Sequence, residues 1–480
     1  NGSIMRKGRD AMHYHLAIDI GASGGRHILG WLEDGCIRTK EVYRFENGAA
    51  MKDGHLCWNM QALEQHVIQG LKACREAGCV PETMGIDTWA VDFALLDAQD
   101  KRLGDVVAYR DERVQGMDTL LEKTMPFAEL YRRTGIAKQP FNTVYQLMAV
   151  LREHPEYREQ AADFLLVPEY LSFLLTGKKA HEWTNVSTTA LADAETHTWS
   201  APVLEAAGLP EKLFRTPIVT PGTVLGTLLP SVRDAAGFDV QVILPATHDT
   251  GSAYMAVPAR DERAAFLSSG TWSLLGTELA APCTDEGSRG VGFTNEGGWG
   301  YTTRYLKNIM GMWMLQCLRH ELGDRYSYAQ MAEMAAQSDY PAWINAADNR
   351  FLAPESMTAE VCDALREAGA PEPATPGDLY RAVTMGLAVC YRDSIREMET
   401  HTGHSFTSIN IVGGGSQNRT LNQMTANLTG LPVLAGPTEG TALGNLAAQM
   451  IAAGEVADLA AFRALLPCSF PIETYMPTKG

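Results

Sequence analysis

The chain has little of what marks membrane, secreted or nucleic-acid-binding proteins. None of its 480 residues fall in a run of 18 consecutive apolar residues, so no membrane-spanning helix is expected. Its formal net charge of -17 disfavours nucleic acid and anionic membranes as partners, because both require clustered Lys and Arg. The nine cysteines include no C-x-x-C pair, which favours reduced thiols in a cytoplasmic protein, although Cys74 and Cys79 could pair if oxidised.

The first residues also lack a recognisable targeting signal. Residues 1–13 have no apolar segment of signal-peptide length and are predicted to be a leader or a remnant of expression outside the fold. The chain of 480 residues is too long for one ordinary core, so two or three domains of about 150 to 250 residues are expected. A stretch at 210–230 with several prolines and glycines favours a boundary near residue 245.

A glycine-rich turn, Gly21-Ala22-Ser23-Gly24-Gly25, joins two predicted strands at 15–20 and 26–32. No Gly-Lys-Ser/Thr follows, which excludes a Walker A loop, and no helix follows, which disfavours a dinucleotide-binding turn. Free backbone N–H groups could hold an anion there, and Asp19 could meet a metal ion or its water. A plain tight hairpin explains the pattern equally well.

The strand-turn-strand pattern returns at 264–276, and two such turns suggest a duplicated domain with a nucleotide between the copies. A predicted strand at 408–412 leads through Gly413, Gly414 and Gly415 to a predicted helix at 418–429. Three glycines there would let a base or ribose approach the backbone.

Several polar residues interrupt otherwise apolar segments. His248-Asp249-Thr250 follows an apolar run at a predicted helix start, where Asp249 is a proton acceptor or merely a helix cap. The helix dipole would help to keep that carboxylate ionised. A helix is predicted over 306–318, in which Asn308 and Gln316 would lie about 12 Å apart and meet two ligand groups, or only cap the helix and face solvent. The segment 441–466 is predicted to be helical and to cover the second sheet.

The chain resembles the FGGY carbohydrate kinases of the sugar kinase, heat-shock ATPase and actin superfamily. The resemblance rests on Asp19-Ile20-Gly21, on Ser269-Gly270-Thr271 and on the run from Gly414 to Val433, and it spans nearly all of 15–466. Within the family, the chain is most similar to members that phosphorylate L-rhamnulose. The segments that carry this similarity are Gly85–Trp89, Ala108–Asp111, Leu267–Leu275, Thr294–Gly298 and Lys307–Gly311.

This resemblance implies an α/β fold of two duplicated actin-like (ribonuclease H-like) ATPase domains. Each domain would have a mixed five-stranded sheet flanked by helices, with the active site in the cleft between them. Residues 14–245 would form the N-terminal domain, which binds the sugar and contains the first phosphate turn, and residues 246–480 the nucleotide-binding C-terminal domain.

The implied reaction is ATP-dependent phosphorylation of L-rhamnulose to L-rhamnulose 1-phosphate in L-rhamnose catabolism. Asp249 would be the general base, and Asp19 would hold Mg²⁺, through water. The implied sugar contacts are Ala90, His248, Asp249, Thr250 and Asn308. The implied ATP contacts are Ala22, Ser23, Gly24, Gly25, Arg26, Thr271, Gln316 and Gly414. Ala90 stands where the family usually has glycine, so the exact sugar stays open. Gly24 stands where serine is commoner, which removes one possible hydroxyl contact from the phosphate turn but keeps its backbone N–H groups.

The implied partners are the sugar and ATP, without nucleic acid or membrane, and the expected protein is a cytoplasmic monomer or weak homodimer. A kinase for xylulose, ribulose, fuculose or glycerol is the nearest alternative. An ATPase of the same fold that acts on protein partners would show basal hydrolysis without sugar. A non-catalytic sugar-binding regulator would bind sugar but not ATP.

Overall fold

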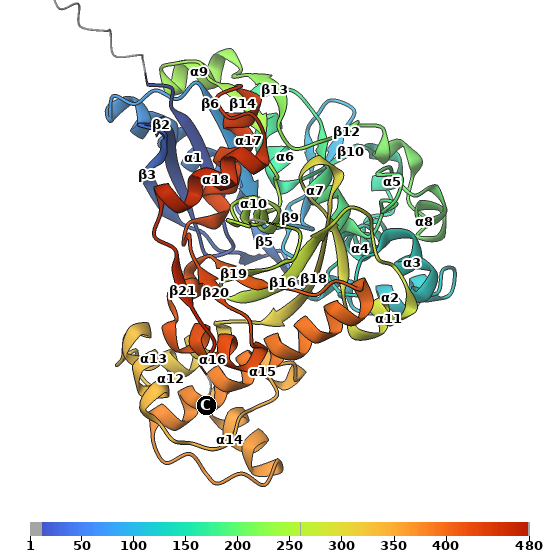
Figure 1. Cartoon of the computed structure of the whole chain (residues 1–480). Helices are drawn as coiled ribbons and strands as arrows, with labels where there is room; N and C mark the ends of the chain where they lie inside the picture. Colours follow the sequence, from blue (N-terminus) through green and yellow to red (C-terminus); the bar gives the residue numbers. More distant parts are fainter. Residues whose placement is uncertain (1–11, 260, 479–480) are drawn as a thin grey trace, which may run out of the picture.

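The computed structural model describes residues 12–259 and 261–478, which form two large mixed sheets flanked by helices (Figure 1). Most of the predicted leader, residues 1–11, lies outside the described residues. Within them, the first sheet has six strands and the second has seven, so both are larger than the five strands expected. Strands at the sheet edges account for the difference, and the predicted α/β class with two mixed sheets is confirmed.

The first sheet has the strand order β13-β14-β6-β1-β2-β3. β1 pairs in parallel with β6, and β6 with β14, so the carboxyl ends of these three strands meet at one edge. β1 is almost fully buried because helices cover both faces of the sheet, which explains its apolar sequence. The strands are β1 (His15–Ile20), β2 (Gly24–Glu33), β3 (Cys36–Glu46), β6 (Thr83–Thr88), β13 (Thr223–Thr227) and β14 (Gln241–Leu244).

The two faces of this sheet are covered by helices from opposite ends of the chain. One face packs on α1 (Met60–Glu76), α6 (Val167–Thr176) and α9 (Pro230–Ala236). The other face packs on α17 (Gly440–Ala452) and α18 (Leu459–Ser469), drawn in red beside the blue strands in Figure 1. The prediction that the tail covers the second sheet is therefore wrong, because Leu446 and Phe462 are buried against Ala17 and Ile28 of the first.

The second sheet has the order β17-β18-β16-β15-β19-β20-β21, with β15 and β19 parallel and β15 and β16 forming the repeated hairpin. Helices α12, α13, α14, α15 and α16 pack around one large core with it. Its strands are β15 (Ala264–Ser269), β16 (Trp272–Leu279), β17 (Thr294–Gly297), β18 (Thr303–Met310), β19 (Ser408–Val412), β20 (Val433–Ala435) and β21 (Glu473–Tyr475). The helices are α12 (Trp313–Glu321), α13 (Tyr328–Gln337), α14 (Met357–Glu367), α15 (Pro376–Thr402) and α16 (Arg419–Thr429).

The helix predicted over 306–318 is wrong in its first part. Residues 303–310 pair with β16 along its whole length, and α12 begins only at Trp313. Gly311 lies at the change of direction, where a Cβ would come within 2.7 Å of the Ser273 backbone nitrogen. A short apolar run does not by itself distinguish strand from helix, and cross-strand pairing decides here.

A helical region between β7 and β13 has its own apolar core around Phe164 and Trp183. Its helices are α2 (Met117–Glu122), α3 (Phe127–Thr134), α4 (Thr143–Glu153), α5 (Tyr157–Gln160), α7 (Trp183–Val186) and α8 (Ala201–Ala206). The remaining strands are small: β4 (Ala50–Lys52), β5 (His55–Trp58), β7 (Phe93–Asp97), β8 (Arg102–Leu103), β9 (Val106–Val107), β10 (Ala161–Leu166), β11 (His181–Glu182) and β12 (Ile218–Val219). A short helix, α11 (Glu286–Val291), precedes β17. None of the helices in the described residues is long and apolar enough to cross a membrane.

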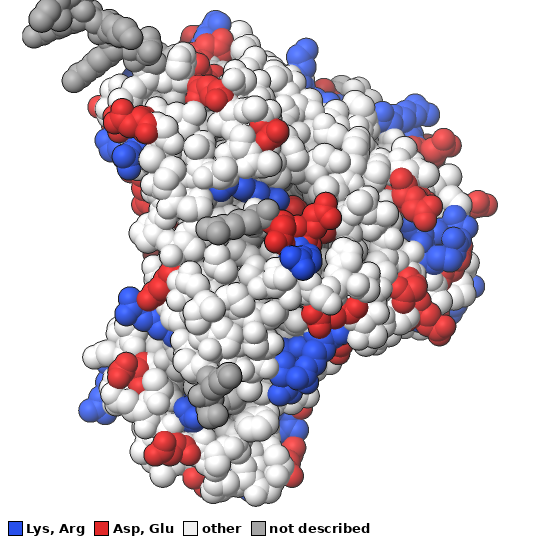
Figure 2. Space-filling model, viewed as in Figure 1, with Lys and Arg blue, Asp and Glu red and all other residues white. Residues whose placement is uncertain are grey.

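Helix α10 (Asp249–Met255) connects the two sheets. It packs on α17 over the first sheet, and its Tyr254 ring lies edge-on to Phe266 of β15, with ring centroids 5.3 Å apart. The first residue of α10 therefore stands where both halves of the chain meet. Figure 2 shows acidic and basic side chains interspersed over the face in view, without a large area of either sign.

Candidate active site

Carboxylates gather at the edge where β1, β6 and the extension of β14 end. Asp19 and Asp87 are neighbours on parallel strands, and Thr88 bridges to His248 in the chain beyond β14. Asp87 is fully buried and accepts a hydrogen bond of 2.6 Å from Asn445 Nδ2 of α17. Burial and the nearby Asp19 raise the pKa of Asp87 well above its ordinary value.

Asp249 is the first residue of α10, as the sequence predicts, and His248 occupies the N-cap position without a side-chain capping hydrogen bond. The Thr250 backbone N–H donates to Asp249 Oδ1 at 2.7 Å, while the carboxylate side chain stays 34% exposed and open to a ligand. Burial of the surrounding site, followed by the charge of Asp19, raises the Asp249 pKa to about 7. Burial thus outweighs the helix dipole, which was expected to favour the ionised form.

A buried charge pair of the second sheet reaches His248. Arg304 of β18 is fully buried, lies 3.0 Å from Glu296 of β17 and donates from Nε to the Gly297 carbonyl at 2.7 Å. Its Nη2 lies 3.2 Å from His248 Nδ1, and His248 Nε2 lies 3.3 Å from Asp249 Oδ1. Burial and the positive charge of Arg304 lower the His248 pKa well below its ordinary value, so the imidazole is neutral.

Glu182 anchors the chain just before the candidate base. Its carboxylate accepts hydrogen bonds from Thr247 N at 2.9 Å, Thr247 Oγ1 at 2.8 Å and the hydroxyl of Thr184. Burial raises its pKa to about 7. Sequence reasoning missed Glu182, Glu296 and Arg304 as parts of this site. Two sequence signals were available: Glu182 opens a run of polar residues at 182–189, and Glu296 lies in the segment Thr294–Gly298 that carries the family resemblance.

The first glycine turn is tight and lies beside Asp19. Gly21 N donates to the Gly24 carbonyl at 2.8 Å, which leaves Ala22 and Ser23 at the tip. Gly24 already belongs to β2, where a Cβ would come within 2.9 Å of the Phe45 carbonyl oxygen. Arg26 donates to Asp19 Oδ2 at 2.8 Å and also pairs with Glu439 beside α17, so it is engaged by two carboxylates.

The second turn, Ser269–Trp272, is held by the start of α12. Met312 N donates to the Gly270 carbonyl at 3.0 Å and Trp313 N to the Thr271 carbonyl at 3.1 Å. Gln316 of α12 therefore lies one helical turn beyond this hairpin. Asn308 lies instead on β18, opposite Leu274, and is exposed on the same strand face as Arg304, four residues away.

The three consecutive glycines after β19 have different roles. Gly413 has φ +89°, and a Cβ there would come within 2.7 Å of the Ser269 carbonyl oxygen. A Cβ at Gly415 would lie 1.9 Å from Ser269 Oγ. Gly414 alone has open space around its Cβ position. Two of the glycines therefore allow the turn to pack on β15, and only Gly414 is open to a ligand.

The chain after β6 turns sharply around a buried carboxylate. Asp92 accepts hydrogen bonds from Trp58 Nε1 at 2.7 Å and Trp89 Nε1 at 3.0 Å, and burial raises its pKa to about 6. Val91 adopts φ +69°, which is rare for a β-branched residue. Ala90, half-buried, lies inside this fixed turn, so its position relative to β6 is well defined.

The acidic edge suits a hard cation held through water. Asp87 Oδ1 is buried without a hydrogen-bond partner, and the charge of Asp19, which helps to raise the pKa of Asp87 and of Asp249, would be offset by a cation. The carboxylate oxygens of these three residues do not all lie within 4.8 Å of one another, so they are too far apart to bind one metal ion directly together. Mg²⁺ commonly keeps several waters, which suits this separation.

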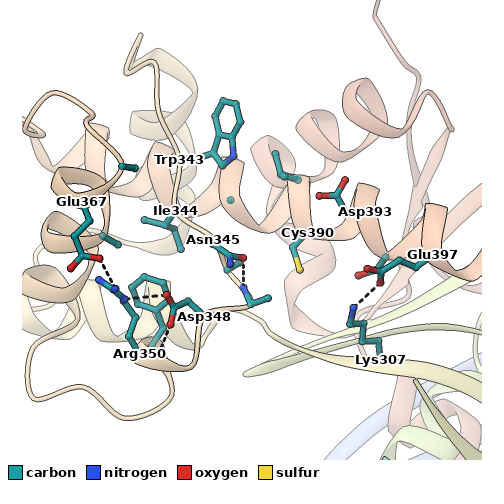
Figure 3. Close-up of a pocket in the computed structure, with 18 residues that line it drawn as sticks. Lys307, Trp343, Ile344, Asn345, Asp348, Arg350, Glu367, Cys390, Asp393 and Glu397 are labelled. Carbon is teal, nitrogen blue, oxygen red and sulfur yellow. Dashed lines mark hydrogen bonds and ion pairs between the residues drawn. The ribbon is translucent and has the colours of Figure 1, made fainter. Parts of the chain in front are cut away.

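A cavity of about 540 Å³ lies elsewhere, between α14, α15 and the segment 343–351 (Figure 3). Its cations are already paired: Lys307 with Glu397 at 2.7 Å, and Arg350 with Glu367 at 2.7 Å. None of the predicted sugar or nucleotide contacts lines it. Lys307 points to this side of β18, the face opposite Asn308.

Family models match both halves of the chain. The model of the FGGY family of carbohydrate kinases, N-terminal domain, matches residues 14–256, and that of the C-terminal domain matches residues 265–453. Together with the two-sheet fold, these matches define a carbohydrate kinase. The chain belongs to the FGGY family, whose members use ATP.

Relatives extend over nearly the whole chain. A rhamnulokinase of Halalkalibacterium halodurans is 45% identical over 466 residues, covering 97% of this chain and 99% of that protein. A rhamnulokinase of Oceanobacillus iheyensis is 42% identical, covering 96% of this chain and 98% of that protein.

Solved structures share the fold at low sequence identity. A gluconate kinase from Lactobacillus acidophilus matches with TM-score 0.80 and 17% identity, covering 98% of this chain and 94% of that one. The Plasmodium falciparum glycerol kinase with ADP matches with TM-score 0.77 and 14% identity, covering 97% and 94%.

Proposed function

We propose that this carbohydrate kinase transfers the γ-phosphoryl group of ATP to the terminal hydroxyl of L-rhamnulose, giving L-rhamnulose 1-phosphate in L-rhamnose catabolism. The observation that carries the proposal is Asp249, a partly exposed carboxylate with a pKa of about 7 at the junction of the two halves. A base of that pKa is ionised to a useful degree near neutral pH and can accept the hydroxyl proton. The full-length rhamnulokinase relatives supply the substrate class.

The sugar would lie against the end of β6 and the start of α10. Ala90 is held there by the Asp92 turn, while His248 and Thr250 flank the base. Asn308 would meet a more distant hydroxyl from the exposed face of β18. The methyl group of Ala90 would narrow this pocket relative to glycine.

ATP would lie between the two glycine turns. The phosphates would meet Ala22, Ser23, Gly24, Gly25 and Arg26, and the rest of the nucleotide would meet Thr271, Gln316 and the open backbone of Gly414. Asp19 would hold Mg²⁺ through water, and that ion would neutralise charge on the phosphates. Asp19 also holds Arg26 at 2.8 Å, which keeps a cation beside the turn that receives the anion.

We also propose the division into 14–245 and 246–480, with both substrates shared between the two parts: the second supplies four of the five sugar contacts, and the first supplies five of the eight ATP contacts. Closure of the halves would exclude water that could otherwise accept the phosphoryl group. We further propose a cytoplasmic location, since all nine cysteines are free thiols, as a reducing compartment would keep them. We also propose that the protein is a monomer or a weak homodimer.

A coupled ADP-release screen over L-rhamnulose, xylulose, ribulose, fuculose and glycerol tests the proposal. L-Rhamnulose should give the highest kcat/KM. A lower rank would leave the family intact and overturn the specific substrate. ATP hydrolysis that is equally fast without any sugar would favour the protein-directed ATPase instead.

A further inference from the structure

Two cysteines from opposite ends of the chain are in contact. Cys36 is the first residue of β3, and Cys468 lies near the end of α18, which runs beside β3 in Figure 1. Their Sγ atoms are 3.4 Å apart. A disulfide needs about 2.05 Å between sulfurs, so closing the bond requires a movement of little more than about 1 Å.

The backbone on both sides of this contact is fixed. Ile37 N donates to Ser469 Oγ at 2.8 Å, which ties the start of β3 to the end of α18. The β2–β3 turn, Asp34-Gly35, has φ +52° and +73°, the left-handed pair of a tight two-residue hairpin. On the helix side, Leu466 is fully buried in the core under the first sheet. Strand β3 and helix α18 therefore hold the two sulfur atoms close to each other.

Access and spacing distinguish this pair from the other cysteines. Cys468 is exposed and Cys36 is half-buried, so a small oxidant can reach them. The sequence suggested Cys74 and Cys79 instead. Cys74, however, is fully buried on α1, and Cys79 Sγ lies 3.5 Å from the Ala77 carbonyl oxygen. The geometry favours Cys36 and Cys468.

We propose that Cys36 and Cys468 are an oxidation site, which a low-molecular-weight disulfide such as oxidised glutathione converts to an intramolecular disulfide. One protein thiolate attacks the oxidant and releases one thiol, leaving a mixed disulfide on the protein. The second protein thiolate attacks that sulfur and releases the second thiol. The two cysteines lose two electrons and two protons, and the oxidant becomes two thiols.

The cross-link would act on stability and leave the active site untouched. It joins residues 432 positions apart, so it removes a large share of the unfolded chain's freedom. It also fixes α18 on the sheet whose opposite end carries Asp19. β2 runs its full ten residues between the glycine turn and the cysteine turn, roughly 30 Å. Contact with Cys468 raises the Cys36 pKa, so the exchange should be faster at higher pH.

Redox titration of the full chain in glutathione buffers tests the proposal, with peptide mapping of the products. The expected product is a Cys36–Cys468 disulfide, formed at a buffer ratio that leaves Cys317, Cys362 and Cys390 as thiols. Cys36→Ser and Cys468→Ser should each abolish it, and the matched control Cys362→Ser should not. Glutathione remaining on Cys468 in the wild type, or a Cys74–Cys79 link in its place, would overturn the proposal.

Thermal unfolding supplies a second readout. Oxidised wild type should melt roughly 5 °C or more above the reduced protein, while Cys36→Ser should show no oxidation-dependent shift. The kcat/KM of the oxidised wild type should stay within about twofold of that of the reduced wild type, because the cross-link is about 30 Å from the glycine turn. An unchanged Tm in fully cross-linked protein would contradict the stabilising role.

Discussion

Arg304 Nη2 lies 3.2 Å from His248 Nδ1, and this contact decides which imidazole nitrogen carries the proton. A guanidinium only donates, so Nδ1 accepts. The Glu296 carboxylate is slightly farther from Nδ1, at 3.4 Å, and its negative charge is neutralised by the ion pair with Arg304. The proton is thus assigned to Nε2, which faces Asp249 at 3.3 Å. Arg304 of the second sheet thereby orients His248, which in turn contacts the candidate base Asp249 beyond the first sheet.

Removing Arg304 should separate its structural role from its role at the base. Arg304→Met leaves Glu296 buried without its partner and should cost about 3–5 kcal/mol of unfolding free energy. Adding Glu296→Gln removes both charges and should recover most of that loss in urea unfolding. Turnover should stay low in both variants, on the order of 10²-fold below wild type, because His248 is no longer oriented. A stable double variant with normal kcat would refute this positioning role.

The pH profile should report the ionisation of Asp249. With a pKa of about 7, its basic form is lost as the pH falls, so kcat/KM should decline below about pH 7. Asp19→Asn removes a like charge that helps to raise this pKa and should move the acid limb to lower pH. Any loss of Mg²⁺ binding would lower the whole profile, whereas the position of the limb reports the base. An acid limb that does not move would mean that another group titrates.

Asp249→Asn should lose turnover and retain the fold. General-base catalysis contributes on the order of 10²–10⁴-fold, and a loss of that size is expected in coupled ADP release. ATP binding, measured by calorimetry, should be unchanged. Asp118→Asn, a surface change on α2, is the matched control with normal activity. Turnover near that of wild type would remove Asp249 from the role of base.

The same variant should alter stability in a defined pH window. The raised pKa of Asp249 means that the folded state binds a proton more tightly than the unfolded state. Its contribution to stability is present below about pH 4 and is lost as the pH rises through about 7. Asp249→Asn avoids that loss, so the urea midpoint of the wild type should decrease relative to that of the variant as the pH rises from about 4 to about 7. A difference in midpoint between variant and wild type that is the same at about pH 5 and about pH 8 would contradict the shift.

Neighbouring glycines offer a paired test of the nucleotide site. Gly414→Ala meets open space, so Tm should be normal while the KM for ATP rises if the nucleotide lies against this backbone. Gly415→Ala places a Cβ 1.9 Å from Ser269 Oγ and should cost about 1–3 kcal/mol of stability. A normal ATP KM in Gly414→Ala would place the nucleotide elsewhere.

Local sequence patterns predicted the strands and long helices well. The strands at 15–20 and 408–412 match β1 and β19, since each is an apolar run bounded by turn residues. The helix predicted over 418–429 is α16, which begins one residue later. The errors lie where distant pairing decides: 306–310 became a strand by pairing with β16, and the tail returned to the first sheet.

The candidate site was predictable only in part for the same reason. Asp19 and Asp249 carry recognisable local context, a glycine turn and a helix start. Arg304 does not, because its partner His248 is 56 positions away and nothing in either local pattern indicates the contact. The triple glycine was interpreted as a nucleotide contact throughout, but contact with Ser269 accounts for Gly413 and Gly415.

Because α17 and α18 pack on the first sheet, the ribosome synthesises the strands of that sheet long before two of the helices that cover it. Strand β14 completes the pairing of that sheet at Leu244, yet the helices over one face end only at Ser469. At about 5–20 residues per second, a ribosome needs roughly 10–45 s to deliver them. During that interval the nascent sheet presents Ala17, Ile28 and Ile37 without their cover. The first sheet therefore cannot bury both of its faces until the C-terminal helices α17 and α18 have been synthesised.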